Sequence, residues 1–505
     1  MIGWRGVFLG WICCWLGLPL AADTLTNAST NLTGLSSSQL RVLQLVGRNR
    51  GGGQWTDLSS NQLVELRIKA ELADDIIRKA HLPGGLVASV RYADTNRTDP
   101  LAYENLDLSG AYTGLYLTAS TFRYAVYREP TVLANVRAAL EGIELLLRSS
   151  GRPGYLPRFA GLASEPAYKA FYSHWGGEDP SRPGFGKLAY RGESNVSAYV
   201  WLGGPSREVY AGINLGLASV FQIVREPKIR ERMTNIVDQM MTRLIADKWR
   251  LDDGHGNLTF APPLLTMALL RTAASVNPKK YATLYQAQIA DMQTTHGGDL
   301  QPQPGLCLYC DYQDSVYLLA NLMVLSRLEP DTSPAKLYFQ DRLNQAYRAS
   351  SYQLNPWLAA SYVSIFEHAP NDVASRSVLQ GLLYQFPIPR WTTAGLRDTN
   401  APIETQEANG SVWAKVPLQL NQRATAAFQW EVSPAVLAPG EDAWVAHPGI
   451  DFILPFWISR DANVIPDAES LAPAAAAANS RDRLRSPTNS PRKTLPNTNA
   501  PPVKN

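Results

Sequence analysis

A phrase that occurs twice limits what this chain can fold into. Residues 112–130 read YTGLYLTASTFRYAVYREP, and residues 210–227 read YAGINLGLASVFQIVREP. In both copies Tyr-x-Gly opens an apolar helical pattern, Arg-Glu-Pro closes it, and a second amphipathic pattern follows. A repeated pair of helices joined by a proline-marked turn predicts a helical array that buries its core between neighbouring pairs.

The same plan continues along the chain. Helical spacing is present at 59–81, a helix, Asn-Pro turn and helix at 264–289, and two further pairs at 313–350 and 355–386. Proline has no amide hydrogen and a preset φ, so it is tolerated in the first turn of a helix and disfavoured further in. With a weak helix at 37–46 the count is about twelve. Six hairpins of this kind predict an all-α dominated α/α toroid, with an open solenoid as the alternative.

The pattern changes beyond residue 388. SVWAKVPLQL, TAAFQWEV and GIDFILPFWISR are interpreted as short strands or extended segments between Pro and Gly turns. They predict a small mixed, partly β C-terminal appendage packed on the helical body. The predicted organisation is a signal peptide at 1–22, a loose lead-in at 23–58, the toroid at 59–387, the appendage at 388–465 and a disordered basic tail at 466–505.

The N-terminal residues have the composition of a secretory leader. Arg5 precedes an apolar run, and Ala21-Ala22 provide a small-residue exit. We therefore expect cleavage after Ala22 and a secreted or periplasmic protein, with a single membrane anchor as the alternative. The cleaved chain has no stable membrane span in this interpretation, because the apolar run is short for one.

Charge argues against one class of partner. The tail from residue 472 carries six basic residues and one acidic residue, while the whole chain is only +3. The body is therefore mildly acidic, and its charge favours no nucleic-acid partner. The sequence does not define an oligomeric state.

Only Cys307 and Cys310 remain after removal of the leader. A Cys-x-x-Cys in an exported protein is more often a local disulfide than half of a zinc site. A metal-dependent enzyme that uses these cysteines and a histidine is the minor alternative. The main interpretation expects no metal and no cofactor.

The unrepeated loops contain the residues with chemical potential. They connect one hairpin to the next at 149–208, 246–262 and 292–314, and should gather on one face together with the stretch before Tyr112. Carboxylates with aromatic neighbours suit a sugar site, since apolar rings stack on pyranoses and carboxyls exchange protons with a glycosidic oxygen. The candidate catalytic acids are Asp107, Glu208, Asp253 and Asp314, and the candidate substrate-binding residues are Arg158, Trp175, Trp201, Trp249 and His296.

Simpler explanations exist for several of these residues. Asp253 lies in a good turn sequence, and Asp107, Glu208 and Asp314 stand where helices begin, as caps or dipole partners do. Gly114 and Gly212 are interpreted as close helix contacts and not as binding residues.

The repeat with its loops resembles the six-hairpin α/α toroid superfamily of glycoside hydrolases, polysaccharide lyases and uronyl epimerases. Several phrases are similar to a broad group of exported bacterial proteins: SGAYTGLYLTASTFRYAV, GYLPRFAG, WLGGPSREVYAGINLGL, NPWLAASYVSIF and PGIDFILPFWISR. The resemblance spans roughly residues 60–460 and implies a site in the central funnel, at the end with the long loops. Relatives tend to have an Asp-containing phrase where this chain has Pro205-Ser206-Arg207-Glu208.

Two functions of different class follow from these observations. The first is an exported enzyme acting on a carbohydrate or cell-surface polymer, most simply a glycoside hydrolase with two carboxyls flanking one bond. The second is a non-catalytic toroid that binds a glycan or a protein at the cell surface.

Overall fold

The structure is a computed structural model, and it describes most of the helical body. The described residues are 56–93, 100–165, 189–204, 206–252, 258–295, 312–366, 373–386, 403–406, 412–414, 417–418, 433–435 and 445–467. The leader, the helix predicted at 37–46, the segment TAAFQWEV and the tail from residue 468 lie outside these residues, so those predictions stay predictions.

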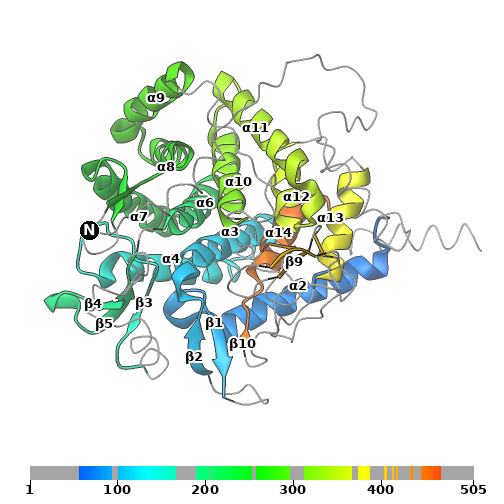
Figure 1. Cartoon of the computed structure of the whole chain (residues 1–505), viewed down its shortest axis with the longest axis horizontal. Helices are drawn as coiled ribbons and strands as arrows, with labels where there is room; N and C mark the ends of the chain where they lie inside the picture. Colours follow the sequence, from blue (N-terminus) through cyan, green and yellow to red (C-terminus); the bar gives the residue numbers. More distant parts are fainter. Residues whose placement is uncertain are drawn as a thin grey trace, which may run out of the picture.

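Six helices of the described chain form an inner ring (Figure 1). Each contacts the next, and the last contacts the first, so the ring is closed. Helix α6 also contacts α10 across the ring. The inner helices are α3 (Ser109–Tyr127), α6 (Arg207–Ile223), α8 (Pro263–Val276), α10 (Tyr312–Leu328), α12 (Pro356–Val363) and α14 (Ile450–Asp461).

A second layer of helices packs around this ring, one against each inner helix. Five of the six pairs are consecutive hairpins, and the sixth joins the two ends of the body by packing α2 against α14. The chain is therefore an α/α toroid, as the sequence predicts. The outer helices are α4 (Leu133–Ser149), α7 (Pro227–Ala246), α9 (Pro278–Thr295), α11 (Pro334–Ser350), α13 (Val373–Gln385) and α2 (Ser60–Ala80).

The prediction for residues 449–460 is wrong. They form no strand but helix α14, in which every residue from Ile450 to Arg460 is buried. The ring thus takes its sixth inner helix from inside the range predicted to be an appendage. The predicted count of twelve matches the described helices, although α14 takes the place of the weak helix at 37–46.

Proline marks helix starts as expected. Five described helices have proline as their first residue, which removes an amide hydrogen that the helix cannot use there. These prolines are Pro227, Pro263, Pro278, Pro334 and Pro356.

Short strands and single turns occupy the connections. The ribbons are β10–β1–β2, β3–β5–β4, β6–β7 and β8–β9, and every pairing is antiparallel. Strand β9 confirms the extended structure predicted for part of SVWAKVPLQL. The strands are β1 (Ser89–Tyr92), β2 (Pro100–Glu104), β3 (Phe159–Leu162), β4 (Ala189–Arg191), β5 (Tyr199–Leu202), β6 (Arg250–Asp252), β7 (Leu258–Phe260), β8 (Ile403–Gln406), β9 (Val412–Ala414) and β10 (Val445–Ala446), and the 3-10 turns are η1 (Pro83–Gly85), η2 (Leu106–Leu108), η3 (Ser194–Val196) and η4 (Ser351–Gln353).

The repeated glycines bring α3 and α6 into backbone contact. A Cβ atom on Gly114 would lie 2.2 Å from the carbonyl carbon of Gly212, and one on Gly212 would lie 2.6 Å from the carbonyl oxygen of Ala111. Gly216 continues the contact one turn along α6, where a Cβ would lie 2.7 Å from the Gly114 oxygen. The interpretation of Gly114 and Gly212 as close helix contacts is confirmed.

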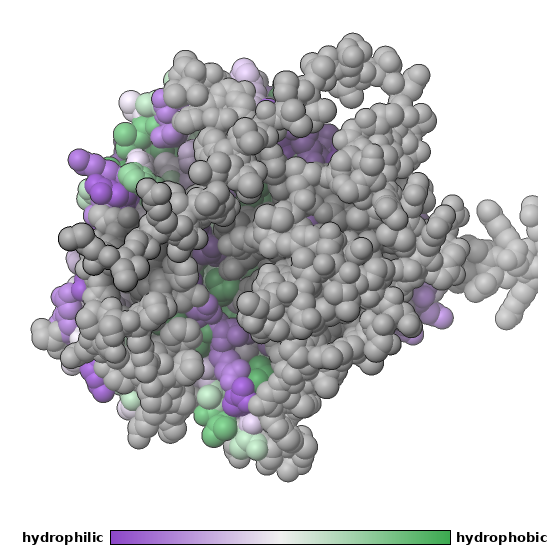
Figure 2. Space-filling model, viewed as in Figure 1, coloured by the Kyte–Doolittle hydropathy of each residue, from purple (hydrophilic) through white to green (hydrophobic). Residues whose placement is uncertain are grey.

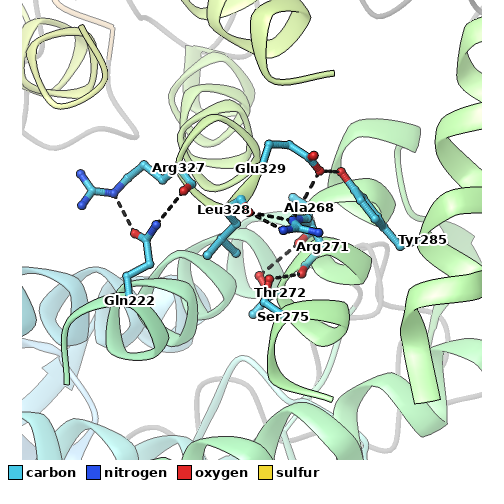
Figure 3. A network of polar contacts seen from close by, with 9 residues as sticks. All are labelled: Gln222, Ala268, Arg271, Thr272, Ser275, Tyr285, Arg327, Leu328 and Glu329. Atoms are coloured by element: carbon cyan, nitrogen blue, oxygen red, sulfur yellow. Dashed lines mark hydrogen bonds and ion pairs between the residues drawn. The ribbon is translucent and has the colours of Figure 1, made fainter. Parts of the chain in front are cut away.

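Arginines close the ring where α6 and α10 end. Arg327 Nε donates to Gln222 Oε1 at 2.8 Å, and Gln222 Nε2 donates back to the Arg327 carbonyl at 2.8 Å (Figure 3). The Arg327 guanidinium also lies 4.9 Å from the centre of the Phe122 ring on α3. Cations near carbonyls at helix C-termini are favoured by the helix dipole, so Arg327 stabilises the junction of three inner helices.

A second arginine holds the next junction of the same network. Arg271 on α8 donates through Nε to the Leu328 carbonyl at 3.0 Å and lies 3.4 Å from Glu329. Glu329 is 5% exposed and also accepts a hydrogen bond from the Tyr285 hydroxyl (Figure 3). The Glu329-Pro330 turn is therefore anchored by a buried ion pair.

Lys69 links α2 to the C-terminal end of α13 through hydrogen bonds to backbone carbonyls. Its ammonium donates to the carbonyls of Leu383 at 3.0 Å and Tyr384 at 2.9 Å, and lies 5.0 Å from the centre of the Phe452 ring. Burial lowers the pKa of Lys69 to about 7.

We expect this lysine to make stability depend on pH. An unfolded lysine has a pKa of about 10.4, so between roughly pH 7 and pH 10 the unfolded chain holds a proton that the folded chain has released. The contribution of Lys69 to the free energy of unfolding therefore rises with pH through that window. Below about pH 7 the lysine is charged in both states, and the full free-energy cost of burying its charge lowers the stability. In urea unfolding, the free energy of the parent minus that of Lys69→Met should increase by about 1–2 kcal/mol from pH 6.5 to pH 9. Parallel pH profiles of parent and variant would contradict this.

Candidate functional site

The site builds up where α3 and α6 begin. Asp107 lies in η2, directly before α3, and Glu208 is the second residue of α6. Since α3 and α6 pack against each other along their glycines, these two acids from distant parts of the sequence start neighbouring helices.

Arg158 joins these two helix starts. Its backbone N–H donates to the Leu202 carbonyl on β5 at 2.8 Å, and its carbonyl accepts from the Gly110 N–H in the first turn of α3 at 2.8 Å. Its side chain donates through Nη1 to the Asp107 carbonyl at 2.9 Å. The arginine is therefore fixed by both its backbone and its side chain.

The charges of the three residues are coupled. Arg158 is 7% exposed, and burial lowers its pKa, while the negative charges of Glu208 and Asp107 oppose that change. A guanidinium remains charged even when buried, so it supplies a fixed positive charge on which both carboxylates act. The structure brings together Asp107, Arg158 and Glu208 of the predicted site residues.

The local structure shows that neither acid is the capping side chain of its helix. The N-cap of α6 is Ser206, whose hydroxyl accepts from the Val209 N–H at 3.1 Å and donates to Glu208 Oε2 at 2.8 Å. The N-cap residue of α3 is Leu108, which makes no side-chain cap. An acid near either helix start still interacts favourably with the helix dipole.

The hairpin β6–β7 lies beside this group. Arg243 on α7 forms an ion pair with Asp252 on β6, with 3.0 Å between Nη2 and Oδ2. Burial raises the pKa of Tyr155, and the negative charge of Asp252 raises it further. Tyr155 also acts electrostatically on the pKa of Arg158. The loops at 149–208 and 246–262 and the stretch before α3 therefore meet at one end of α3 and α6, as the sequence predicts for that face.

Tyr155 and Tyr210 are the members of this site that the sequence interpretation passed over. Both are buried, at 2% and 6% exposed, and burial raises the pKa of each hydroxyl. Tyr210 is coupled to Arg243 and Asp252. A signal was present, because each tyrosine stands within a quoted phrase, GYLPRFAG or WLGGPSREVYAGINLGL.

The prediction of Trp201 as an exposed sugar platform needs correction. Trp201 is 2% exposed, stacks on Tyr190 with ring centres 4.4 Å apart and meets Tyr155 edge to face at 5.2 Å. Its neighbours Val200 and Leu202 in β5 are buried as well, so this part of the strand belongs to the core on both faces.

Trp249 is half-buried against the main core. It follows α7 with a φ of 60°, and Lys248 before it has a φ of 54°. Two successive non-glycine residues in the left-handed region are costly, and such strain is typical of functional sites and tight turns. The Trp249 N–H donates to the Leu244 carbonyl and its carbonyl accepts from the Ala261 N–H, both at 2.8 Å, so the strained turn holds the hairpin β6–β7 in place.

Several predicted residues lie outside the described part of the chain. They are Asp253, Trp175, His296, Cys307 and Cys310, while Asp314 lies in α10 without a described side chain. Among the described residues, no cluster of three histidine, cysteine or acidic side chains suits a metal ion. In that same part of the chain, no helix combines the length and apolarity that crossing a membrane requires.

The surface seen in Figure 2 is mixed in character. Hydrophilic and hydrophobic described residues lie next to one another near the middle of this face.

Comparison with known proteins identifies no family. No protein-family model matches the sequence, and no curated protein matches it. One similar solved structure is that of cellobiose 2-epimerase from Spirochaeta thermophila DSM 6192, with 12% identity and a TM-score of 0.36, over 79% of this chain and 97% of that one. A similarity at this level carries no argument about activity, so the function is argued from the residues of the site.

Proposed function

We propose that this chain is a carbohydrate-active enzyme, most simply a glycoside hydrolase, with Asp107 and Glu208 as its acid pair. The observation that carries the proposal is the buried guanidinium of Arg158, which bonds the backbone carbonyl of Asp107 and interacts electrostatically with the carboxylates of both Asp107 and Glu208. Three residues from η2, the bend directly before β3 and the first turn of α6 meet there, although about fifty residues separate each from the next in the sequence.

The roles follow from glycosidase chemistry. One carboxyl protonates the oxygen of the leaving sugar, and the other acts as nucleophile or activates water, so that water is added across the glycosidic bond. Glu208 accepts the Ser206 hydroxyl at 2.8 Å, and a carboxylate held by a donor suits the base or nucleophile. Asp107 is then the proton donor, and Arg158 fixes the backbone at Asp107 and acts on both carboxylates through its charge. Export after cleavage at Ala22 belongs to the same proposal.

The first test is the replacement of each acid by its amide. Asp107→Asn and Glu208→Gln should each lower kcat by about 100-fold or more, because positioned proton transfer contributes about 10²–10⁴-fold. Purified parent and variants would be screened on neutral and acidic polysaccharides, with released reducing ends and binding both recorded.

The control is Glu231→Gln, which removes an exposed acid from α7 and should leave kcat unchanged. Unchanged turnover in Asp107→Asn and Glu208→Gln would overturn the acid pair. Glycan binding by the parent without any product release would instead assign the chain to the non-catalytic class of toroids.

A further inference from the structure

Three glutamates occupy the same position in the sequence plan. Each stands before the proline that marks a turn between an inner and an outer helix: Glu129, Glu226 and Glu329. Two have clear structural roles. Glu226 caps α7 by accepting from the Lys228 and Ile229 N–H groups, and Glu329 forms the buried ion pair with Arg271.

Glu129 differs from the other two. As after Glu329, the next helix begins a few residues later: α4 begins at Leu133, and its N-cap, Val132, makes no side-chain cap. Arg128 adopts a φ of 57° at the end of α3. Glu129 therefore does not cap α4, and its side chain lines a cavity.

This cavity has a volume of about 220 Å³ and lies between α2, α3 and the start of α4. That volume is below the about 300–1,000 Å³ of pockets for drug-sized ligands, so the cavity takes a small molecule. Arg123, in its wall, follows Ser109 by fourteen residues along α3, about 21 Å from the site at Asp107. The lining residues are Arg78, Arg123, Glu129, Thr131, Val132 and Asn135.

The lining is polar and carries both signs of charge. The two arginines are oriented by acids of α2: Arg123 by the buried Asp74, and Arg78 by Asp75 at 2.7 Å. Each guanidinium has five N–H donors, more than these single acids use. The Nε of Arg123 is buried and has no hydrogen-bond partner within the described chain.

Glu129 lines the same cavity as the two arginines, and its negative charge acts on Arg123. It is exposed, and its Oε2 lies 3.5 Å from the Thr131 hydroxyl, at the limit of a hydrogen bond. Asn135 is 8% exposed and adds an amide to the same wall. A ligand with only negative charge would be repelled by Glu129, and one with only positive charge by the arginines.

We propose that this cavity binds a small zwitterion of the amino-acid class. Its carboxylate would pair with the guanidinium groups of Arg78 and Arg123, for which planar bidentate contact is the favoured geometry. Its ammonium would pair with Glu129, and Asn135 and Thr131 would bond its remaining polar atoms. The site is separate from the proposed acid pair and does not depend on it.

The test is calorimetric titration of the whole purified protein with each common L-amino acid, with propionate and with methylamine. At least one amino acid should bind saturably, and propionate and methylamine should bind about tenfold more weakly or not at all. Glu129→Gln and Arg78→Gln should each weaken amino-acid binding by about ten- to a hundredfold, as expected for loss of one charged hydrogen-bond partner.

The variants are chosen so that folding is not at issue. Glu129 and Arg78 are exposed side chains at the surface of the body, whereas Arg123 is tied to the buried Asp74 and is left intact. Glu141→Gln removes an exposed acid from α4, the helix that carries Asn135, but outside the cavity lining, and should leave binding unchanged. Absence of binding by every amino acid, equal binding of propionate, or unaltered affinity in both variants would overturn the proposal.

Discussion

Gly114→Ala should lower the free energy of unfolding by about 4 kcal/mol or more. The added Cβ would lie 2.2–2.3 Å from three backbone atoms, the carbonyl group of Gly212 and the Ile213 nitrogen. Backbone atoms cannot rotate away as a side chain can, so α3 and α6 must separate. Overpacking usually costs about 1–3 kcal/mol, and backbone contact places this case beyond that range.

Urea unfolding followed by the helical signal measures this effect. Alanine is the better helix former by about 1 kcal/mol, so local propensity alone predicts a gain in stability from the same substitution. The control is the reverse exchange at an exposed position of α4, Ala134→Gly, which should cost about 1 kcal/mol through propensity alone. A stability of Gly114→Ala equal to or above that of the parent would show that α3 and α6 are not in backbone contact.

The hairpins were predictable from sequence because local signals mark the start and the extent of their helices. Apolar spacing defines the helices, and prolines such as Pro227 and Pro356 mark where the next helix begins. Both signals are local, and local geometry enforces them, since proline in a helix interior would remove a hydrogen bond and clash.

Helix α14 was not predictable by the same reasoning. Its residues Ile450–Asp461 are rich in Phe, Ile and Trp, which favour strands, and it contains Pro455 in its interior. It also has no polar face, because it is buried on all sides by α2, α3 and α12. A helix that is apolar all round shows no 3.6-residue period, so only tertiary contact identifies it.

The candidate site was half predictable. Loop placement predicted that Asp107, Arg158 and Glu208 lie on one face, and in the structure they lie near one another; their role in catalysis stays a prediction. The burial of Trp201 was not predictable, because the sequence of a short strand does not show whether a single tryptophan side chain faces solvent or the core. Trp201 was therefore interpreted as a platform, while its stacking on Tyr190 depends on the pairing of β4 with β5.

Trp457→Ala should cost about 3–5 kcal/mol, the range for removing a fully buried tryptophan. The ring of Trp457 is 0% exposed and meets Tyr127 of α3 edge to face, with centres 5.5 Å apart. The Arg123 guanidinium lies 5.4 Å from the same ring. Loss of this side chain opens a cavity at the seam where the last inner helix meets the first, so the whole ring should lose stability in one transition.

This result separates an integral helix from an appendage. If α14 closes the ring, the helical signal of Trp457→Ala should disappear in a single transition at a lower urea concentration than that of the parent. If residues 449–460 were an accessory segment, most of the helical signal would be lost at the parent midpoint, after a small early loss.

The control is Leu337→Ala, at a position 69% exposed on α11, whose free energy of unfolding should stay within about 0.5 kcal/mol of that of the parent. A shift in Trp457→Ala no larger than that of Leu337→Ala would mean that the toroid holds its shape without its C-terminal seam.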